Sequence, residues 1–162
     1  MNDVTEAELR AVFGPRADYY LWQWKAVAPL VNWPAAFLGV PWFLFRRLHR
    51  LALVLCVVWA CVELGLGILL GGYANRQGHS VATMFVSQAS WFVSALVCGV
   101  FANRWYLARV RRIISSTRAR GLSADEHLAE LARQGGTRPL HAIAFVVLLG
   151  VVMVLLWSVG LA

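Results

Sequence analysis

The sequence predicts an all-α polytopic membrane protein with three transmembrane helices and several short interfacial or cytoplasmic helices. Hydrophobic residues make up 60% of the 162 residues and charged residues only 14%, whereas charged residues reach about 25% in a soluble domain. Three apolar stretches, at about 50–71, 81–102 and 141–160, each have the roughly 20 residues that a helix needs to cross a bilayer. These observations exclude an ordinary soluble globular domain.

The chain divides into four predicted regions that follow these spans. In order they are cytoplasmic and interfacial helices at 1–47, a transmembrane hairpin at 48–103, a basic cytoplasmic loop with a short helix at 104–139, and a third transmembrane helix at 140–162. The long loop carries eight arginines, whereas the first hairpin loop carries only Arg76. The positive-inside rule therefore predicts a cytoplasmic N-terminus and a C-terminus at the outer face.

Short helices are expected before the first span. Thr5 and Glu8 form a capping box that starts a helix over 6–13, and a second, aromatic-rich helix is expected over 17–28. The apolar run 33–45 is too short to cross a bilayer, so it is interpreted as a re-entrant or interfacial segment. The alternative is a cytoplasmic extension of the first span with a proline kink.

The ends of the spanning helices also carry sequence signals. Gly71 and Gly72 are predicted to close the first span. The second span is predicted to continue as a helix into the cytoplasm through 105–114. Three arginines of this extension lie at headgroup level and are expected to contact anionic lipid, namely Arg109, Arg111 and Arg112.

A second capping box predicts a short helix in the long loop. It pairs Ser123 with Glu126, and the helix should run to about Arg133 before Gly135 and Gly136 end it. One apolar side is expected to dock this helix onto the protein, formed by Leu128, Leu131 and Ala132.

Glu63 is the one charged residue between Arg50 and Arg76. A carboxylate near the bilayer centre costs several kcal/mol unless it is partnered or protonated, so it is a functional candidate. In an antiparallel pair it lies at the depth of the second span's middle, which makes Ser87, Gln88 or Ser90 its expected hydrogen-bond partner. Two interpretations remain open: a proton-coupled or ligand-sensing acid, and a protonated structural acid that joins two helices.

Small residues recur at helical spacing on both hairpin spans, and such faces pack together in lipid. We expect these two faces to meet. The first consists of Cys56, Ala60, Glu63 and Gly67, and the second of Thr83, Ser87, Ser90, Ser94 and Cys98.

No cofactor and no metal site are predicted, because no Cys/His/carboxylate spacing resembles a ligand set. His49 and His141 both begin the cytoplasmic ends of spans, which leaves haem ligation as a minor alternative. His79 and His127 are isolated in the sequence. The arginine cluster is interpreted as an orientation signal beside the membrane, so nucleic acid is not an expected partner.

Several scattered motifs are similar to a known family. They are GPRADYY from Gly14, NWPAAF from Asn32, and GVPWFLFRR from Gly39, followed by Gly99, Asn103 and Tyr106. Over about residues 13–112 the chain resembles a family of small bacterial inner-membrane proteins catalogued as domain of unknown function 2628. The resemblance implies a location in the bacterial inner membrane and supplies no activity, substrate or catalytic residue.

The aromatic and basic residues at the cytoplasmic interface suit a docking site. The candidates are Tyr19, Tyr20, Trp33, Trp42, Arg46, Arg47, Asn103 and Tyr106. Since no catalytic constellation is recognisable, the protein is predicted to be a non-enzymatic interaction, accessory, regulatory or immunity-type subunit that binds another membrane protein or itself. The alternative is a component of a small oligomeric transporter or channel that uses Glu63. An enzyme acting on lipid headgroups through Asp18, His49 or Asp125 is the least favoured interpretation.

Overall fold

The computed structural model of the protein describes residues 4–25, 31–77 and 81–158, and every regular element within these ranges is a helix. In chain order the elements are α1 (Glu6–Phe13), the 3₁₀ turn η1 (Gly14–Arg16), α2 (Ala17–Lys25), α3 (Trp33–Leu38), α4 (Val40–Phe45), α5 (His49–Gln77), α6 (Val81–Arg118), α7 (Ala124–Gln134) and α8 (Pro139–Ser158). The all-α prediction is therefore confirmed.

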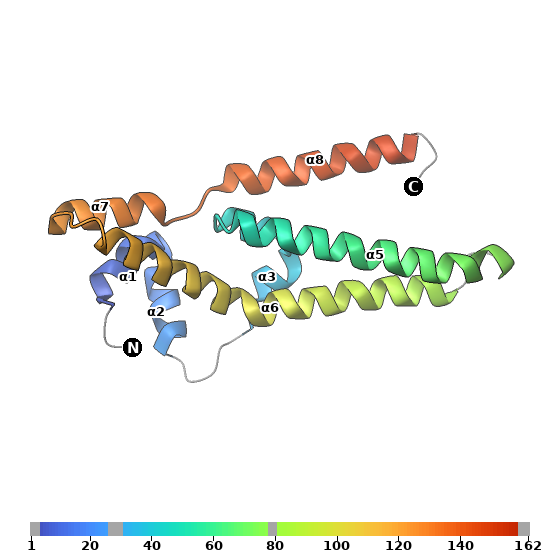
Figure 1. The fold of residues 1–162 in the computed structure, drawn as a ribbon, viewed down its shortest axis with the longest axis horizontal. Helices are drawn as coiled ribbons and strands as arrows, with labels where there is room; N and C mark the ends of the chain where they lie inside the picture. Colours follow the sequence, from blue (N-terminus) through green and yellow to red (C-terminus); the bar gives the residue numbers. More distant parts are fainter. Residues whose placement is uncertain (1–3, 26–30, 78–80, 159–162) are drawn as a thin grey trace.

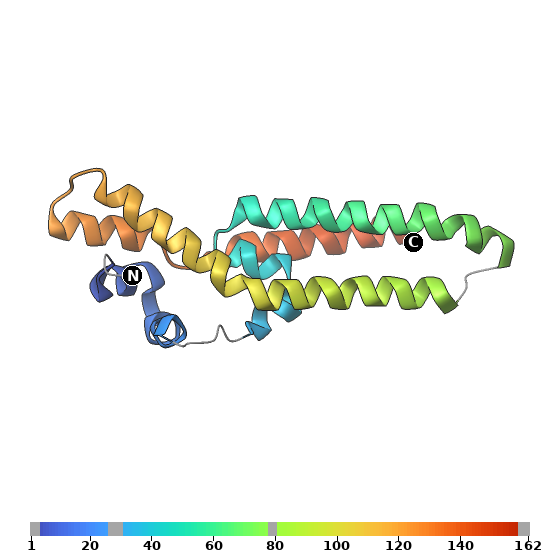
Figure 2. The ribbon, with the colours of Figure 1, turned by 60° about the horizontal axis from the view of Figure 1, so that its bottom comes forward.

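Three helical stretches among the described residues are long and apolar enough to cross a membrane, as predicted. They lie in α5, in α6 and in the segment that ends with α8. Figures 1 and 2 show α5 and α6 side by side in opposite directions, with α8 running in the same direction as α5. Helix α5 does not stop at Gly71 and Gly72 but continues to Gln77, so the prediction that these glycines end the helix is wrong.

The other helices gather at one end of the molecule. We call α1, α2, α7 and residues 104–118 of α6 the head; it lies away from the turn between α5 and α6 (Figure 1). Both predicted capping boxes are present: Thr5 N donates to Glu8 Oε2 at 2.8 Å, and Ser123 N donates to Glu126 Oε2 at 3.1 Å. The predicted continuation of the second span is also confirmed, since α6 extends to Arg118.

The segment 33–45 forms two short helices, α3 and α4, between the head and the spanning helices. Gly39, with φ of +54°, bends the chain between them. A turn at 46–48, in which Arg47 has φ of +60°, separates α4 from α5. The alternative of one kinked helix running into the first span is therefore wrong, because the backbone leaves the helical conformation at this turn. Helix α3 packs on α6, and α4 packs on α5 and α8.

The buried core lies in the head and at its junction with α3 and α4, not between the spans. Among the described residues the largest fully buried apolar side chains are Phe13, Phe43, Ile114, Leu131, Val12 and Val110. Leu131 docks α7 as predicted and Leu128 is half-buried, but Ala132 is exposed, so the prediction fails for that residue. Helix α7 packs on α1 and on α6.

Helices α1 and α7 approach each other closely at Gly135. A Cβ atom at this position would lie 2.3 Å from the carbonyl oxygen of Val12 and 2.7 Å from its Cα atom. The neighbouring Gly136 N donates to Val12 O at 2.9 Å. Glycine at position 135 is therefore a steric requirement of the head.

Candidate functional site

The intramembrane acid Glu63 lies on the hairpin formed by α5 and α6. The Ser90 hydroxyl donates a hydrogen bond to Glu63 Oε1 at 2.7 Å. A cavity of about 370 Å³ adjoins this pair, lined by Trp59, Glu63, Ser87, Gln88 and Trp91. The structure thus brings together the acid and all three side chains considered as its partners.

The Glu63 cavity faces outward from the hairpin. Ser87 and Gln88 are exposed, and Glu63 is half-buried. Trp59 and Trp91 flank the cavity with 47% and 45% of their surfaces exposed. Polar side chains of the spanning helices are therefore exposed on the outer surface of the hairpin.

The two small-residue faces meet only in part. Ala60 is exposed, and a Cβ atom built on Gly67 would meet nothing within 4 Å, so the predicted packing is wrong at these two positions. Part of the α6 face is occupied by another element, because α3 packs against Gly99. Cys98 is buried in that region, and the side chain of Thr83 lies outside the described part of the chain.

A second polar group is buried where the head meets the spanning helices. Arg46, directly after α4, is only 2% exposed. Four aromatic rings surround its guanidinium carbon, with centroids at 4.8 Å for Tyr20, 5.1 Å for Tyr106, 5.6 Å for Phe45 and 5.9 Å for Trp42. We call these four rings the aromatic cage. The distances lie within the roughly 6 Å over which a ring attracts a cation.

Contacts among the rings of different elements hold the cage in place. Phe13 of α1 stacks on Tyr20 of α2 with centroids 4.9 Å apart. Tyr106 of α6 lies 5.0 Å from Tyr20 and 6.3 Å from Trp42. Burial raises the pKa of Tyr20 above its ordinary value, so this phenol stays neutral under ordinary conditions. The cage is thus a rigid, uncharged enclosure around one cation.

The cage leaves hydrogen-bonding groups of Arg46 unsatisfied. Its Nε and Nη1 atoms are buried without a hydrogen-bond partner, and so is the hydroxyl of Tyr106. The Tyr106 ring lies beside the guanidinium, but no hydrogen bond of acceptable geometry joins them. Aromatic faces attract the charge but do not replace oxygen acceptors, so this buried cation is costly in the absence of an anion.

A cavity of about 350 Å³ adjoins the cage between α2, α3 and α4. The described residues that line it include two arginines and no carboxylate; they are Arg16, Tyr19, Tyr20, Asn32, Pro34, Trp42 and Arg46. The nearby acid Asp18 is bound to Arg10 at 2.9 Å instead. The electrostatic potential in this cavity is therefore positive.

Hydrogen bonds of Asn32 fix the wall of this cavity to α6. Its Nδ2 donates to Asn103 Oδ1 at 2.7 Å, and its backbone N donates to Gly99 O at 2.8 Å. Its Oδ1 accepts from Ala35 N at 3.0 Å, which caps α3. A Cβ atom on Gly99 would lie 2.9 Å from the Cβ atom of Ala36, so glycine permits this close approach.

Most of the predicted docking residues lie inside the protein. Five of them are 4% exposed or less, namely Tyr20, Trp42, Arg46, Asn103 and Tyr106. The expectation of a docking surface is wrong for these five, because Phe13 and Tyr20 pack on Tyr106 and the start of α3 covers Asn103. Tyr19 and Trp33 remain exposed, at 45% and 63%.

Arg47 points away from the cage and holds the end of α7. Its Nη1 donates to the carbonyl oxygens of Arg133 at 2.9 Å, Gln134 at 2.9 Å and Gly135 at 2.8 Å. These are carbonyl groups that a helix C-terminus leaves without partners. We call this arrangement the Arg47 clasp; it joins the turn before α5 to the head.

The arginines expected at headgroup level differ in their surroundings. Arg109 is half-buried and turned toward α7, where its Nη2 donates to Gln134 O at 3.4 Å. Arg111 and Arg112 are exposed on α6. Contact of these three residues with anionic lipid stays a prediction.

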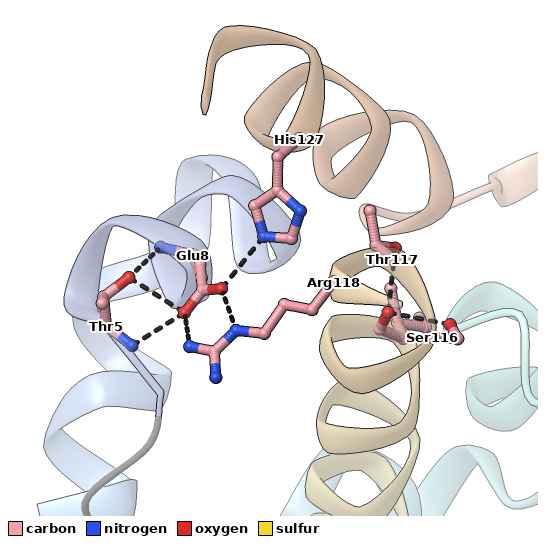
Figure 3. A network of polar contacts seen from close by, with 7 residues as sticks. Thr5, Glu8, Ser116, Thr117, Arg118 and His127 are labelled. Atoms are coloured by element: carbon pink, nitrogen blue, oxygen red, sulfur yellow. Dashed lines mark hydrogen bonds and ion pairs between the residues drawn. The ribbon is translucent and has the colours of Figure 1, made fainter. Parts of the chain in front are cut away.

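A buried ion-pair network joins α1, α6 and α7 (Figure 3). Glu8, 5% exposed, accepts from Arg118 Nε at 2.8 Å and Nη2 at 2.7 Å, and His127 Nε2 lies 2.9 Å from its Oε1. The Arg118 guanidinium is the main reason that the pKa of Glu8 falls to about 2. The sequence revealed Glu8 as a capping residue only, and His127 is not isolated. No local signal could pair Glu8 with residues more than a hundred positions away.

His49 and His141 contact each other edge to face, with ring centroids 4.8 Å apart. Haem ligation by these two histidines stays a prediction. Asp18, His49 and Asp125, named for the least favoured enzyme interpretation, do not share either cavity. No cluster of three metal-ligating side chains occurs among the described residues.

Taken together, the three apolar helical stretches, the polar groups of the hairpin and the caged arginine define a helical polytopic membrane protein. The chain belongs to the family described as protein of unknown function DUF2628, whose model matches residues 9–112. The matched region contains both cavities and ends before α7 and α8. Comparison with curated proteins and with solved structures finds no match.

Proposed function

We propose that this protein is a non-enzymatic accessory subunit of the bacterial inner membrane that binds a transmembrane helix, of another protein or of a second copy, through the hairpin of α5 and α6. In this proposal the N-terminus is cytoplasmic and the C-terminus periplasmic, as the arginine distribution favours. The carrying observation is the outward-facing Glu63 cavity, with its exposed Ser87 and Gln88.

The energetic argument starts from the surroundings of that cavity. In hydrocarbon, a carboxyl, an amide and a hydroxyl group lose the hydrogen bonds that water would give them. Glu63 has one such bond, from Ser90 at 2.7 Å. A neighbouring helix with a polar side chain would satisfy the remaining groups and cover the cavity, since polar residues join helices in membranes.

The spanning helices also leave most of their own surface uncovered. No residue of the most apolar windows of α5 and α8 is buried within the chain. Lipid covers such surface readily, but small and polar faces favour another helix. The uncovered Ala60 and Gly67 lie on the α5 face that carries Glu63.

Association can be tested with the full chain in a mild detergent and in liposomes. We expect Glu63→Leu combined with Gln88→Leu to weaken association about tenfold or more, since each substitution removes a hydrogen-bonding group from the interface. Phe92→Leu, at a 64% exposed position of α6, is the matched control. Energy transfer between labelled copies reports self-association, and native mass spectrometry reports a different partner. A parent protein that stays monomeric and partnerless, or association unaffected by the double substitution, contradicts the proposal.

Membrane orientation is tested separately. A periplasm-dependent reporter fused after Ala162 should be active, and a cytoplasm-dependent reporter at the same position should be inactive. The reverse pattern contradicts the proposed topology.

The same cavity favours a second candidate, an oligomeric transporter or channel component in which Glu63 carries protons. Its support is the space of about 370 Å³ beside the acid. In liposomes, Glu63→Gln should abolish proton or ion flux. Absence of flux in the parent, or equal flux in the mutant, eliminates this candidate.

A further inference from the structure

We propose that the cavity beside the aromatic cage binds a phosphate group, held by Arg46 and Arg16. This site is separate from the Glu63 cavity, and the proposal goes beyond a role in helix association. Its strongest support is Arg46 itself, 2% exposed, with Nε and Nη1 buried and without hydrogen-bond partners.

The first step concerns charge. The residues described along the cavity bring two guanidinium groups and no carboxylate. The acids of neighbouring elements are engaged elsewhere, because Glu8 binds Arg118 at 2.7 Å and Asp18 binds Arg10 at 2.9 Å. An anionic ligand in this cavity would therefore balance the charge of the two arginines, which no described carboxylate in the lining does.

The second step concerns hydrogen bonds. The cage attracts the Arg46 cation but offers Nε and Nη1 no oxygen acceptor. An oxyanion accepts such N–H groups in strong, charge-assisted bonds, and arginine is the side chain best suited to this.

The third step selects phosphate among the oxyanions. The charged donors come from different elements: Arg16 from η1 and Arg46 from the turn after α4. A carboxylate presents two oxygens in one plane and suits one guanidinium. A phosphate presents oxygens in several directions, so it can accept from donors on separate elements at once.

The shape of the cavity also fits such a group. Its volume of about 350 Å³ exceeds what a bare phosphate needs and leaves space for a glycerol-sized substituent along Tyr19, Pro34 and Trp42. The cavity lies between the η1–α2 segment and the α3–α4 segment. An anionic phospholipid headgroup and a soluble phosphate ester are two sources of the same chemistry.

The full chain in neutral detergent provides the test, with Kd values from titration calorimetry. The probes are inorganic phosphate, sn-glycerol 3-phosphate and dihexanoyl-phosphatidylglycerol, and sodium hexanoate serves as the carboxylate comparison. We expect phosphate-bearing probes to bind and hexanoate to bind at least about tenfold more weakly. Binding by phosphatidylglycerol alone assigns the lipid source, whereas equal binding of glycerol 3-phosphate assigns a soluble one.

Two substitutions identify the binding residues. Arg46→Gln should weaken binding of the best probe about tenfold or more, and Arg16→Gln by about threefold or more, since Arg16 lies at the exposed rim. Arg112→Gln, at an exposed arginine outside the cavity, is the matched control and should leave Kd unchanged. Arg16→Gln alters an exposed side chain and keeps the test decisive if Arg46→Gln does not fold.

Three outcomes overturn the proposal. In the first, the parent protein binds none of the three phosphate probes. In the second, hexanoate binds as tightly as the phosphate probes do. In the third, the Arg16→Gln protein and the folded Arg46→Gln protein have the same Kd as the Arg112→Gln protein. None of these outcomes affects association through the Glu63 cavity, so failure of one proposal is distinguishable from failure of the other.

Discussion

Replacing Gly135 by alanine should loosen the head, because the added methyl group would overlap the backbone of α1. The Cβ atom would lie 2.3 Å from Val12 O, 2.7 Å from its Cα and 2.9 Å from its carbonyl carbon. A backbone cannot turn aside as a flexible side chain can, so relief requires α1 and α7 to separate. Separation would also break the bond from Gly136 N to Val12 O, now 2.9 Å long.

The magnitude follows from these two effects. Overpacking of a close contact costs about 1–3 kcal/mol, and loss of the backbone hydrogen bond adds about 1 kcal/mol. The total of about 2–4 kcal/mol corresponds to a fall in Tm of roughly 10 °C for a chain of this size. Thermal unfolding in detergent, followed by tryptophan fluorescence, measures the change, and hydrogen exchange should show the loss of protection concentrated in α1 and α7.

Gly136→Ala supplies the control. Gly136 has φ of +69°, and a Cβ atom there would meet nothing within 4 Å, so only backbone strain of about 1 kcal/mol is expected. The steric argument is refuted if Gly135→Ala is no more destabilising than Gly136→Ala, or if hydrogen exchange in α7 does not change.

Two further predictions concern the head. The pKa of Glu8 is about 2, below the ordinary 4.5, so its ion pair stabilises the fold above about pH 4.5 and loses that contribution as the pH falls toward 2. The Tm of the parent protein should therefore fall between pH 6 and pH 3, and Glu8→Gln should make this fall shallower. An equal fall of Tm in both proteins would contradict the prediction. Arg47→Ala removes three hydrogen bonds to the last carbonyls of α7. It should lower the free energy of unfolding, measured in urea, by about 2 kcal/mol, and Arg112→Ala, at an exposed arginine, is the control. Equal stabilities of the two variants would show that the Arg47 clasp does not stabilise the fold.

Features governed by local chemistry were predictable from the sequence. The capping boxes at Thr5 and Ser123 depend on residues three positions apart, and both formed. The long apolar stretches satisfy a length requirement set by the bilayer, so the three candidate spans were also predictable from the sequence. The depth match that brought Ser90 to Glu63 required only that two adjacent spans be antiparallel.

Features that depend on distant segments were not predictable. The aromatic residues around Arg46 resembled an interfacial surface, because their sequence positions carry no sign that rings of α2, α4 and α6 converge on one arginine. Likewise, Glu8 and Arg118 are 110 positions apart, and only the tertiary fold brings them together. The unpartnered state of Arg46 is a property of its enclosure and is invisible in the sequence.

Arg46 and Arg47 are consecutive, yet the left-handed conformation at Arg47 sends one guanidinium into the cage and the other to the end of α7. One peptide bond therefore links the enclosed cation with the anchor of the helix that precedes α8. The turn at 46–48 thus joins the wall of the cavity to the segment that leads into the third span, in addition to the direct packing of α4 on α8.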